Sequence, residues 1–189
     1  KPDLEVVSLE PGIDKTTPGE PYTGTVEYKL KDNAPGPVEA ILHMTHNGWG
    51  LKTPGGDDID GKVLTFQPGE IKTFEFNWTG QESDSTFRAE IWPTEPSGAA
   101  KESRDANPMD NVKELVVPRA GYKLTVQKSG EGGTSPPVGV HIKSAGENVS
   151  LSASPSSGWK FIRWEGDASG TDPNTHIVMD RDKKYKGNC

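Results

Sequence analysis

The sequence has 189 residues, a mass of 20.4 kDa and a formal net charge of −7. A single cysteine, Cys189, excludes an intramolecular disulfide and a cysteine-based metal site, and no apolar run is long enough for a transmembrane helix or a signal peptide. Residues 1–118 carry 11 Lys/Arg against 21 Asp/Glu, whereas residues 119–189 carry 10 against 7. An acidic first half argues against nucleic acid as a partner and against binding to an anionic membrane surface, and the lack of a long apolar run argues against membrane insertion.

Apolar and polar residues alternate along most of the first half, which predicts short β-strands. In the clearest example, Val26, Tyr28 and Leu30 share one face. Turn clusters rich in Gly and Pro separate the runs. The expected strands are 3–9, 23–31, 38–46, 63–66, 71–78, 87–91 and 112–117. Seven such strands without a helical period predict an antiparallel sandwich of the immunoglobulin-like type, and the order of strand pairing stays open.

The segment 118–121, Pro-Arg-Ala-Gly, coincides with the shift in charge, so we expect two domains, 1–118 and 119–189. The second is a small β-domain with a Gly/Ser/Pro loop at 129–137. Within it, Trp164 is expected in the core and Trp159 partly exposed, because a small module needs large side chains to build a core. Its expected strands are 122–126, 149–153, 159–165, 175–179 and 184–186.

Several motifs of the first half are similar to the cell-adhesion-related domain found in bacteria, CARDB. They are Pro-Asp-Leu-Glu-Val at 2–6, Pro-Gly-Glu at 18–20, the run 66–78, and the polar loop 105–111. The resemblance covers about residues 2–118 and implies an immunoglobulin-like sandwich. Residues 48–61 look like an insertion, and Pro108-Met109 interrupts the acidic, Asn-rich loop that is typical of the family.

The second half resembles the divergent internalin-B-type repeat of bacterial surface proteins, over nearly all of 121–189. The matching motifs, in order, are 122–126, 130–132, 145–153, 158–167 and 179–183. The resemblance implies a small β-grasp-like spacer or adhesion module without catalysis. The ending Lys-Gly-Asn-Cys at 186–189 departs from the apolar or aromatic strand usual in the family.

The acidic segment Pro-Gly-Gly-Asp-Asp-Ile-Asp-Gly at 54–61 could supply carboxylates to calcium through Asp57, Asp58 and Asp60. Calcium takes hard oxygen ligands, and a Gly-rich loop can wrap around it. The spacing does not match an EF-hand loop, so a solvated acidic hairpin is the alternative interpretation. The loop 105–110 has the same two interpretations. No other cofactor is indicated.

Three tryptophans, Trp49, Trp92 and Trp159, are candidate platforms for a glycan. The alternative for Trp49 is a loop aromatic that packs on the end of the sandwich. His43 and His46 lie three apart on an expected strand, so they point to opposite faces and cannot grip one metal together.

No catalytic motif or triad spacing occurs in the sequence, so we expect a protein that is not an enzyme. The chain begins Lys1-Pro2-Asp3 without Met, and we interpret it as part of a larger bacterial or archaeal protein. The expected function is a non-catalytic spacer or adhesion segment at the cell surface or outside the cell. Its expected partners are the other domains of the same polypeptide and a surface glycan or protein. The alternative is a carbohydrate- or protein-binding module attached to an extracellular enzyme.

Overall fold

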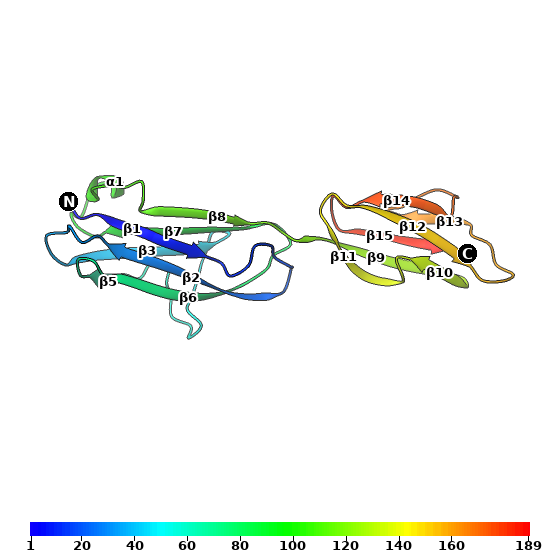
Figure 1. Cartoon of the computed structure of the whole chain (residues 1–189), viewed down its shortest axis with the longest axis horizontal. Coiled ribbons are helices and arrows are strands. Elements are labelled where there is room, and N and C mark those ends of the chain that lie inside the picture. The colour runs from blue at the N-terminus through cyan, green and yellow to red at the C-terminus, as the bar shows by residue number, and fades with distance from the viewer. The chain divides into compact units, whose positions relative to one another are not determined.

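The computed structural model describes all residues from 1 to 189 and divides them into two compact units (Figure 1). The N-terminal unit comprises Lys1–Arg119 and the C-terminal unit comprises Ala120–Cys189, so the division lies one residue from the expected boundary. Apart from one short helix, the regular structure of both units consists of strands. The expectation of an all-β fold is confirmed.

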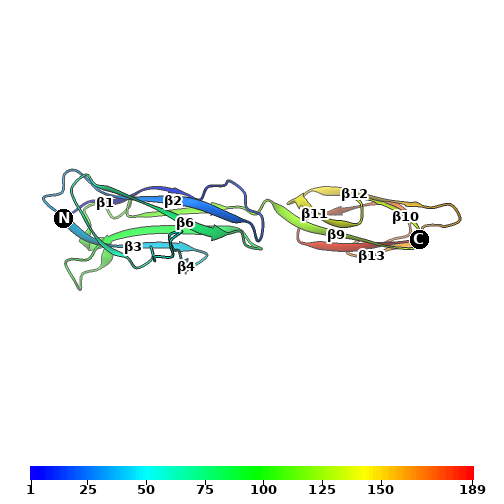
Figure 2. The ribbon, with the colours of Figure 1, turned by 90° about the horizontal axis from the view of Figure 1, so that it is seen from below.

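The N-terminal unit is a sandwich of two sheets, which Figure 2 shows as layers with β1 and β2 on one side and β3 and β4 on the other. One sheet has the order β1-β2-β6; the other has the order β4-β3-β7-β8, with β5 also paired to β3. All these pairs are antiparallel. The elements are β1 (Leu4–Glu10), β2 (Pro21–Leu30), β3 (Val38–His46), β4 (Trp49–Gly50), β5 (Val63–Phe66), β6 (Ile71–Thr79), β7 (Ser85–Pro93), α1 (Lys101–Arg104) and β8 (Val112–Val117).

The alternating pattern turns one face of each sheet inward, as the period of a strand requires. Val26, Tyr28 and Leu30 of β2 are fully buried, as expected from their shared face. Gly24 pairs with Phe76 across the β2–β6 ladder. A Cβ at Gly24 would come within 2.4 Å of the Phe76 ring, so only glycine leaves room for that aromatic residue in the core.

Residues 48–61 contribute to the core of the N-terminal unit more than an insertion would be expected to. Leu51 is 8% exposed and Ile59 is fully buried, and both belong to the main core cluster. The Ile59 amide donates to the Leu51 carbonyl, which closes the loop back on itself. The helix α1 was also not expected, since its four residues are too few to show a helical period.

The C-terminal unit also contains two sheets, with the orders β10-β12-β14 and β11-β9-β15-β13. Its strands are β9 (Gly121–Ser129), β10 (Gly132–Ser135), β11 (Gly139–Ser144), β12 (Asn148–Pro155), β13 (Arg163–Gly166), β14 (Asn174–Val178) and β15 (Lys183–Asn188). The prediction of a loop at 129–137 was wrong, because β10 lies inside it and pairs with β12. The expected strand 159–165 is shorter and begins only at Arg163.

The core of the C-terminal unit is built around Trp164, which is 2% exposed. Its ring packs against Phe161 at 4.9 Å and against Tyr185 at 5.4 Å between centroids. The indole N–H donates to the Asp172 carbonyl at 2.9 Å, which satisfies the polar end of the buried ring. Trp159 is 49% exposed. The expectation of a core Trp164 and a partly exposed Trp159 is confirmed.

In each unit the chain enters at one end and leaves at the other. In the C-terminal unit, β15 runs parallel to β9, so Cys189 follows the end of β15 at the Ser129 end of β9. In the N-terminal unit, the Val6 amide donates to the Asp110 carbonyl and the Thr16 amide donates to the Pro118 carbonyl. The first and last strands therefore run in the same direction there too.

Candidate functional site

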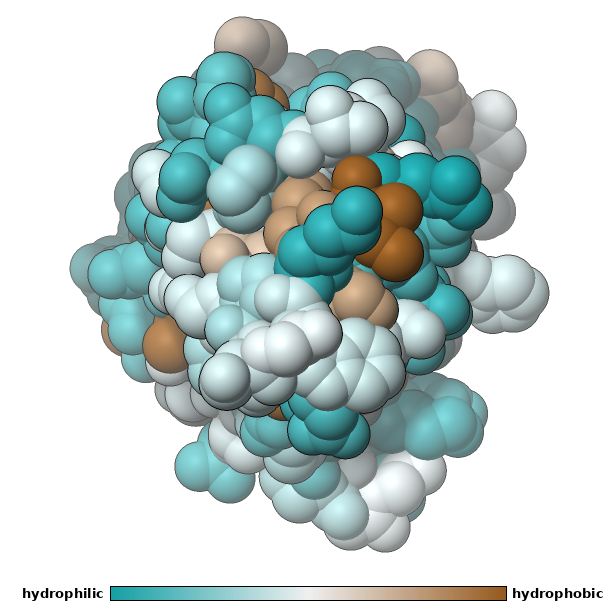
Figure 3. Space-filling model, turned by 90° about the vertical axis from the view of Figure 1, so that its right-hand side faces the viewer, coloured by the Kyte–Doolittle hydropathy of each residue, from teal (hydrophilic) through white to brown (hydrophobic).

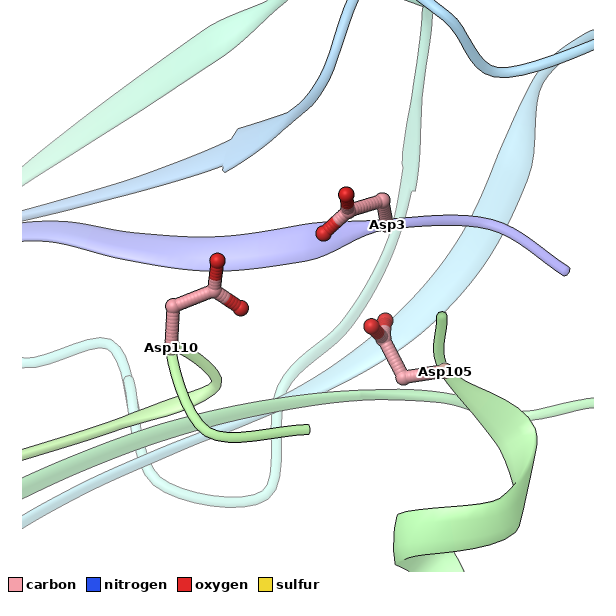
Figure 4. Close-up of side chains that lie close together, drawn as sticks. All are labelled: Asp3, Asp105 and Asp110. Carbon is pink, nitrogen blue, oxygen red and sulfur yellow. The ribbon is translucent and has the colours of Figure 1, made fainter. Parts of the chain in front are cut away.

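Three aspartates from two separate segments of the N-terminal unit converge at the end of the sandwich where β1 begins. Asp3 directly precedes β1, whereas Asp105 and Asp110 lie in the loop between α1 and β8. One carboxylate oxygen of each lies within 4.8 Å of one oxygen of the other two. Figure 4 shows the three carboxyl groups directed toward a common space. We call Asp3, Asp105 and Asp110 the aspartate cluster.

The backbone around the loop holds the aspartate cluster in place. Asp105 is 2% exposed and accepts hydrogen bonds from the Leu4 and Asn107 amides, both at 2.9 Å. Asn107 also donates through its side-chain amide to Asp110 at 2.8 Å. The loop is thereby tied both to itself and to the start of β1, so the three carboxylates do not depend on flexible side chains alone for their position.

Lys31, just after β2, supplies the positive charge beside the aspartate cluster. Its ammonium lies 2.6 Å from Asp110 Oδ2 and 3.1 Å from Asp3 Oδ1. The hydrogen bond to Asp110 raises the pKa of Lys31 well above its usual value; burial acts in the opposite direction, and the hydrogen bond to Asp3 adds a smaller increase. One ammonium does not balance three carboxylates, so the site carries an excess of negative charge.

The donor set of the aspartate cluster suits a hard divalent cation. Two oxygens bound to one calcium, each at about 2.4 Å, can be at most about 4.8 Å apart, and all three carboxylates satisfy this limit. Asp110 Oδ1 is buried and has no hydrogen-bond partner. Calcium would complete its shell with backbone carbonyls and water. The Lys31 ammonium competes for the same oxygens, so cation and lysine are alternative counter-charges.

The aspartates expected from residues 54–61 do not form such a group. Asp58 pairs with Lys52 at 2.6 Å, Asp60 faces His43 at 3.1 Å, and Asp57 is exposed. The carboxylates of Asp58 and Asp60 face different partners instead of a shared space. Asp60 also accepts a hydrogen bond from the Met44 amide at 3.3 Å. Its position is explained by this packing of the loop against β3.

Trp49 is the most exposed of the candidate aromatic residues, at 81%. It follows the tight turn Asn47-Gly48, where both residues have positive φ, and pairs with His46 across the β3–β4 hairpin. The dipeptide Asn-Gly favours this turn. A shallow pocket beside the ring is lined by His46, Asn47, Trp49, Gly50, Leu51 and Gln81.

His46 lies under this pocket as part of the aromatic core. It is 8% exposed, stacks on Phe87 at 4.8 Å between centroids, and shares a hydrogen bond with the Ser85 hydroxyl at 2.9 Å. Burial lowers the pKa of His46 below its usual 6.5. The neutral imidazole is therefore the form that suits the folded state.

The low pKa of His46 predicts that the N-terminal unit loses stability in mild acid. Between the folded and unfolded pKa values the unfolded chain binds more protons, so the free energy of unfolding falls as pH drops below about 6.5. Thermal unfolding across this range measures the effect. His46→Gln should flatten the pH dependence, whereas the control His43→Gln should retain it. An unchanged slope in His46→Gln would contradict the assignment.

The other two candidate tryptophans differ in their access to solvent. Trp92 is 4% exposed and its indole N–H donates to Glu90 at 2.7 Å. A buried ring presents no face to a sugar, which leaves Trp49 and Trp159 as the exposed candidates. The Trp159 ring lies against Gly130, where an added Cβ would be 3.0 Å from it.

Viewed from the right-hand side of Figure 1, the surface is mainly hydrophilic and has a small group of hydrophobic residues (Figure 3).

Sequence reasoning named the loop 105–110 as a candidate calcium loop, with a solvated acidic loop as the alternative, but missed Asp3 and Lys31. Asp3 is about a hundred residues away in the sequence, and only the parallel course of the first and last strands brings it to the loop. The available signal was weak. Asp3 occurs in the motif at 2–6 and the loop occurs at 105–111, and both were recognised as carriers of one family resemblance.

The chain is similar to several solved structures of low sequence identity. A CARDB domain from Pyrococcus furiosus, described as in complex with di-metal ions, is 18% identical with a TM-score of 0.40, over 62% of this chain and 88% of that one. A conjugative transposon lipoprotein from Bacteroides eggerthii is 17% identical with a TM-score of 0.31, over 61% and 92%. A complex of human zinc 2-glycoprotein and prolactin-inducible protein contains a chain 9% identical with a TM-score of 0.39, over 62% and 92%.

These likenesses carry no conclusion about the site, so the CARDB resemblance of residues 2–118 stays a prediction. No curated protein shows significant similarity to the chain. The structure has one helix, of four residues, and this helix is not long and apolar enough to cross a membrane. The resemblance expected for the second half is confirmed: residues 122–188 match the family model described as the divergent InlB B-repeat domain.

Proposed function

We propose that the chain is a non-catalytic spacer or adhesion segment of a larger prokaryotic protein at the cell surface or outside the cell. The observation that carries this proposal is the course of the backbone, which enters each unit at one end of a β-core and leaves at the other. Each unit therefore adds its own strand length to the separation of its neighbours. The match of residues 122–188 to a repeat-domain family also supports it, because repeat domains commonly occur in series.

The physical basis of a spacer is that folded β-cores resist compression better than flexible chain does. β2 and β9, with 10 and 9 residues, are each about 30 Å long at about 3.3 Å per residue. A Gly/Ser-rich chain of the same residue number fluctuates widely about its mean length. The partners in this role are the domains before and after these units in the same polypeptide.

Surface display tests the spacer role directly. The chain is placed between a cell-surface anchor and an N-terminal epitope, and binding of a large antibody to the epitope is measured by flow cytometry. Deletion of residues 120–189 should reduce antibody access, and a Gly/Ser linker of about 30 residues in their place, whose r.m.s. length of about 30 Å equals the length of β9, should restore it only in part because it can be compressed. Equal access in all three forms would contradict the spacer role.

A second candidate function, carbohydrate recognition, is favoured by the exposed Trp49 ring beside its shallow pocket. An exposed aromatic face next to polar side chains is an arrangement that sugars can stack upon. In this alternative the chain is a binding module attached to an extracellular enzyme. The indole of Trp159, on the C-terminal unit, is the second exposed ring.

Glycan binding that depends on Trp49 is the expected sign of this second function. On a glycan array, Trp49→Ala should then abolish binding. Its free energy of unfolding should stay within about 0.5 kcal/mol of that of the original protein, because the ring is almost fully exposed. Met109→Ala, at an exposed side chain of the same unit, serves as the matched control. If the original protein binds no glycan, or if Trp49→Ala binds as well as the original, carbohydrate recognition by Trp49 is rejected.

A further inference from the structure

The first and last strands of the C-terminal unit lie side by side and run in the same direction. β9 and β15 pair in parallel over six residues, from Lys183 opposite Leu124 to Asn188 opposite Ser129. The Cys189 amide continues the contact by donating to the Ser129 carbonyl at 2.9 Å. Both are central strands, because β11 pairs with the other side of β9 and β13 with the other side of β15.

This geometry determines how tension along the backbone acts on the unit. Tension reaches the unit where the chain enters β9 and where it leaves β15. Because the strands are parallel, it draws them along their axes in opposite directions. The hydrogen bonds between them are then sheared together and must break in concert. In a ladder that is peeled from one end, each bond breaks separately and carries the load alone.

Side chains oppose the same sliding motion. Tyr185 lies in the middle of β15, is 1% exposed, and packs against Trp164 in the core. Val126, its register partner on β9, is equally buried. β15 cannot slide along β9 without withdrawing Tyr185 from the core, which adds the cost of exposing an aromatic ring to the cost of breaking the ladder.

In the N-terminal unit, tension also draws the first and last strands in opposite directions, but fewer hydrogen bonds join them. β1 and β8 belong to different sheets. Three backbone hydrogen bonds join the first segment to the last: Val6 to Asp110 and Thr16 to Pro118, both at 2.9 Å, and Ala106 to Pro2 at 2.8 Å. This unit has the larger core, yet it presents fewer bonds to a load applied through its ends.

We propose that the chain bears tensile load and that the β9–β15 ladder makes the C-terminal unit its mechanically stronger element, despite its smaller core. The inference rests on the proposed function, since a segment that separates two attached domains transmits whatever force acts between them. It goes further by predicting that the order of mechanical strength is opposite to the order of core size.

Single-molecule stretching of the full chain tests which of the two units unfolds at the lower force. Handles are attached at Cys189 and at Lys1→Cys, and the unfolding forces are recorded. Release of the N-terminal unit lengthens the chain by up to about 430 Å and release of the C-terminal unit by up to about 250 Å, at about 3.6 Å per residue, so the two events are distinguishable. The longer event should come first, at the lower force. The shorter event first would overturn the proposal.

A second attachment separates pulling geometry from stability. Handles at Glu131→Cys and Cys189 grip the C-terminal unit at one end of the β9–β15 pair, because Cys189 lies beside Ser129 and Glu131 is exposed in the turn after β9. The ladder is then peeled, and the unfolding force should be at least about threefold lower than with the end-to-end handles. Equal forces in the two geometries would overturn the shear mechanism. Either failure leaves the display result intact, so it is distinguishable from failure of the spacer role.

Discussion

Replacing Trp164 with alanine should unfold residues 120–189 while residues 1–119 stay folded. The ring is 2% exposed and contacts both Phe161 and Tyr185, so its removal leaves a large cavity in a core of nine buried residues. Truncation of a buried Trp costs about 3–5 kcal/mol. A domain of 70 residues has a total stability of roughly 4–10 kcal/mol, so most or all of it is lost.

Calorimetry and two-dimensional NMR together measure this outcome. The unfolding transition of the C-terminal unit should disappear or move to a much lower temperature, and the dispersed amide signals of residues 1–119 should persist. Trp159→Ala is the matched control, because that ring is half exposed and should cost only about 1 kcal/mol or less. Loss of signal dispersion in residues 1–119 of the Trp164 variant would show that the two units do not fold independently.

Among the strands that were predicted correctly, the clearest have one buried face. β2 and β3 bury every second residue along most of their length, and that alternation is visible in the sequence. Tyr28 and Leu42 are core residues for this reason. A local pattern is sufficient where a strand packs against a single hydrophobic layer.

The strands that were missed have no such pattern. β10 consists of Gly132-Gly133-Thr134-Ser135, whose backbone pairs with β12 but whose side chains give no apolar period. In β11 the apolar residues Val140 and Ile142 are 63% and 48% exposed, so they do not mark a face that packs against the core. Only pairing with strands distant in the sequence makes these segments regular.

The aspartate cluster illustrates the limit of sequence reasoning for the site. Asp105 and Asp110 are close in the sequence, and a polar loop was recognised there. The β1–β2 pairing brings Lys31 and Asp3 to the same point, where the Lys31 backbone N–H donates a hydrogen bond to the Asp3 carbonyl. Local composition favoured Asp57, Asp58 and Asp60 instead, but two of these have basic partners nearby. Convergence of carboxylates is a property of topology.

Replacing Lys31 with methionine should destabilise the N-terminal unit and make it respond to calcium. The change removes both charged contacts, to Asp3 and Asp110, and leaves the aspartate cluster without its ammonium. The expected loss is about 2–3 kcal/mol, since a charged hydrogen bond contributes about 1.5–3 kcal/mol and Lys31 is partly exposed. Thermal unfolding of the full chain in a calcium-free buffer measures it.

Calcium should recover part of this loss, because the three carboxylates offer the oxygens that a divalent cation prefers and no lysine competes for them. A ligand present at a hundred times its dissociation constant stabilises the folded state by about 2.7 kcal/mol, so a calcium titration of the Lys31→Met unfolding temperature gives the affinity directly.

Lys29→Met is the matched control, since Lys29 lies 3.9 Å from the exposed Asp32 and away from the cluster. An equal calcium response in the two variants would mean that the aspartate cluster does not bind the ion, and that Lys31 and its aspartates form a purely structural ion pair network. A calcium response confined to Lys31→Met, and abolished by adding Asp105→Asn, would place the cation at the cluster.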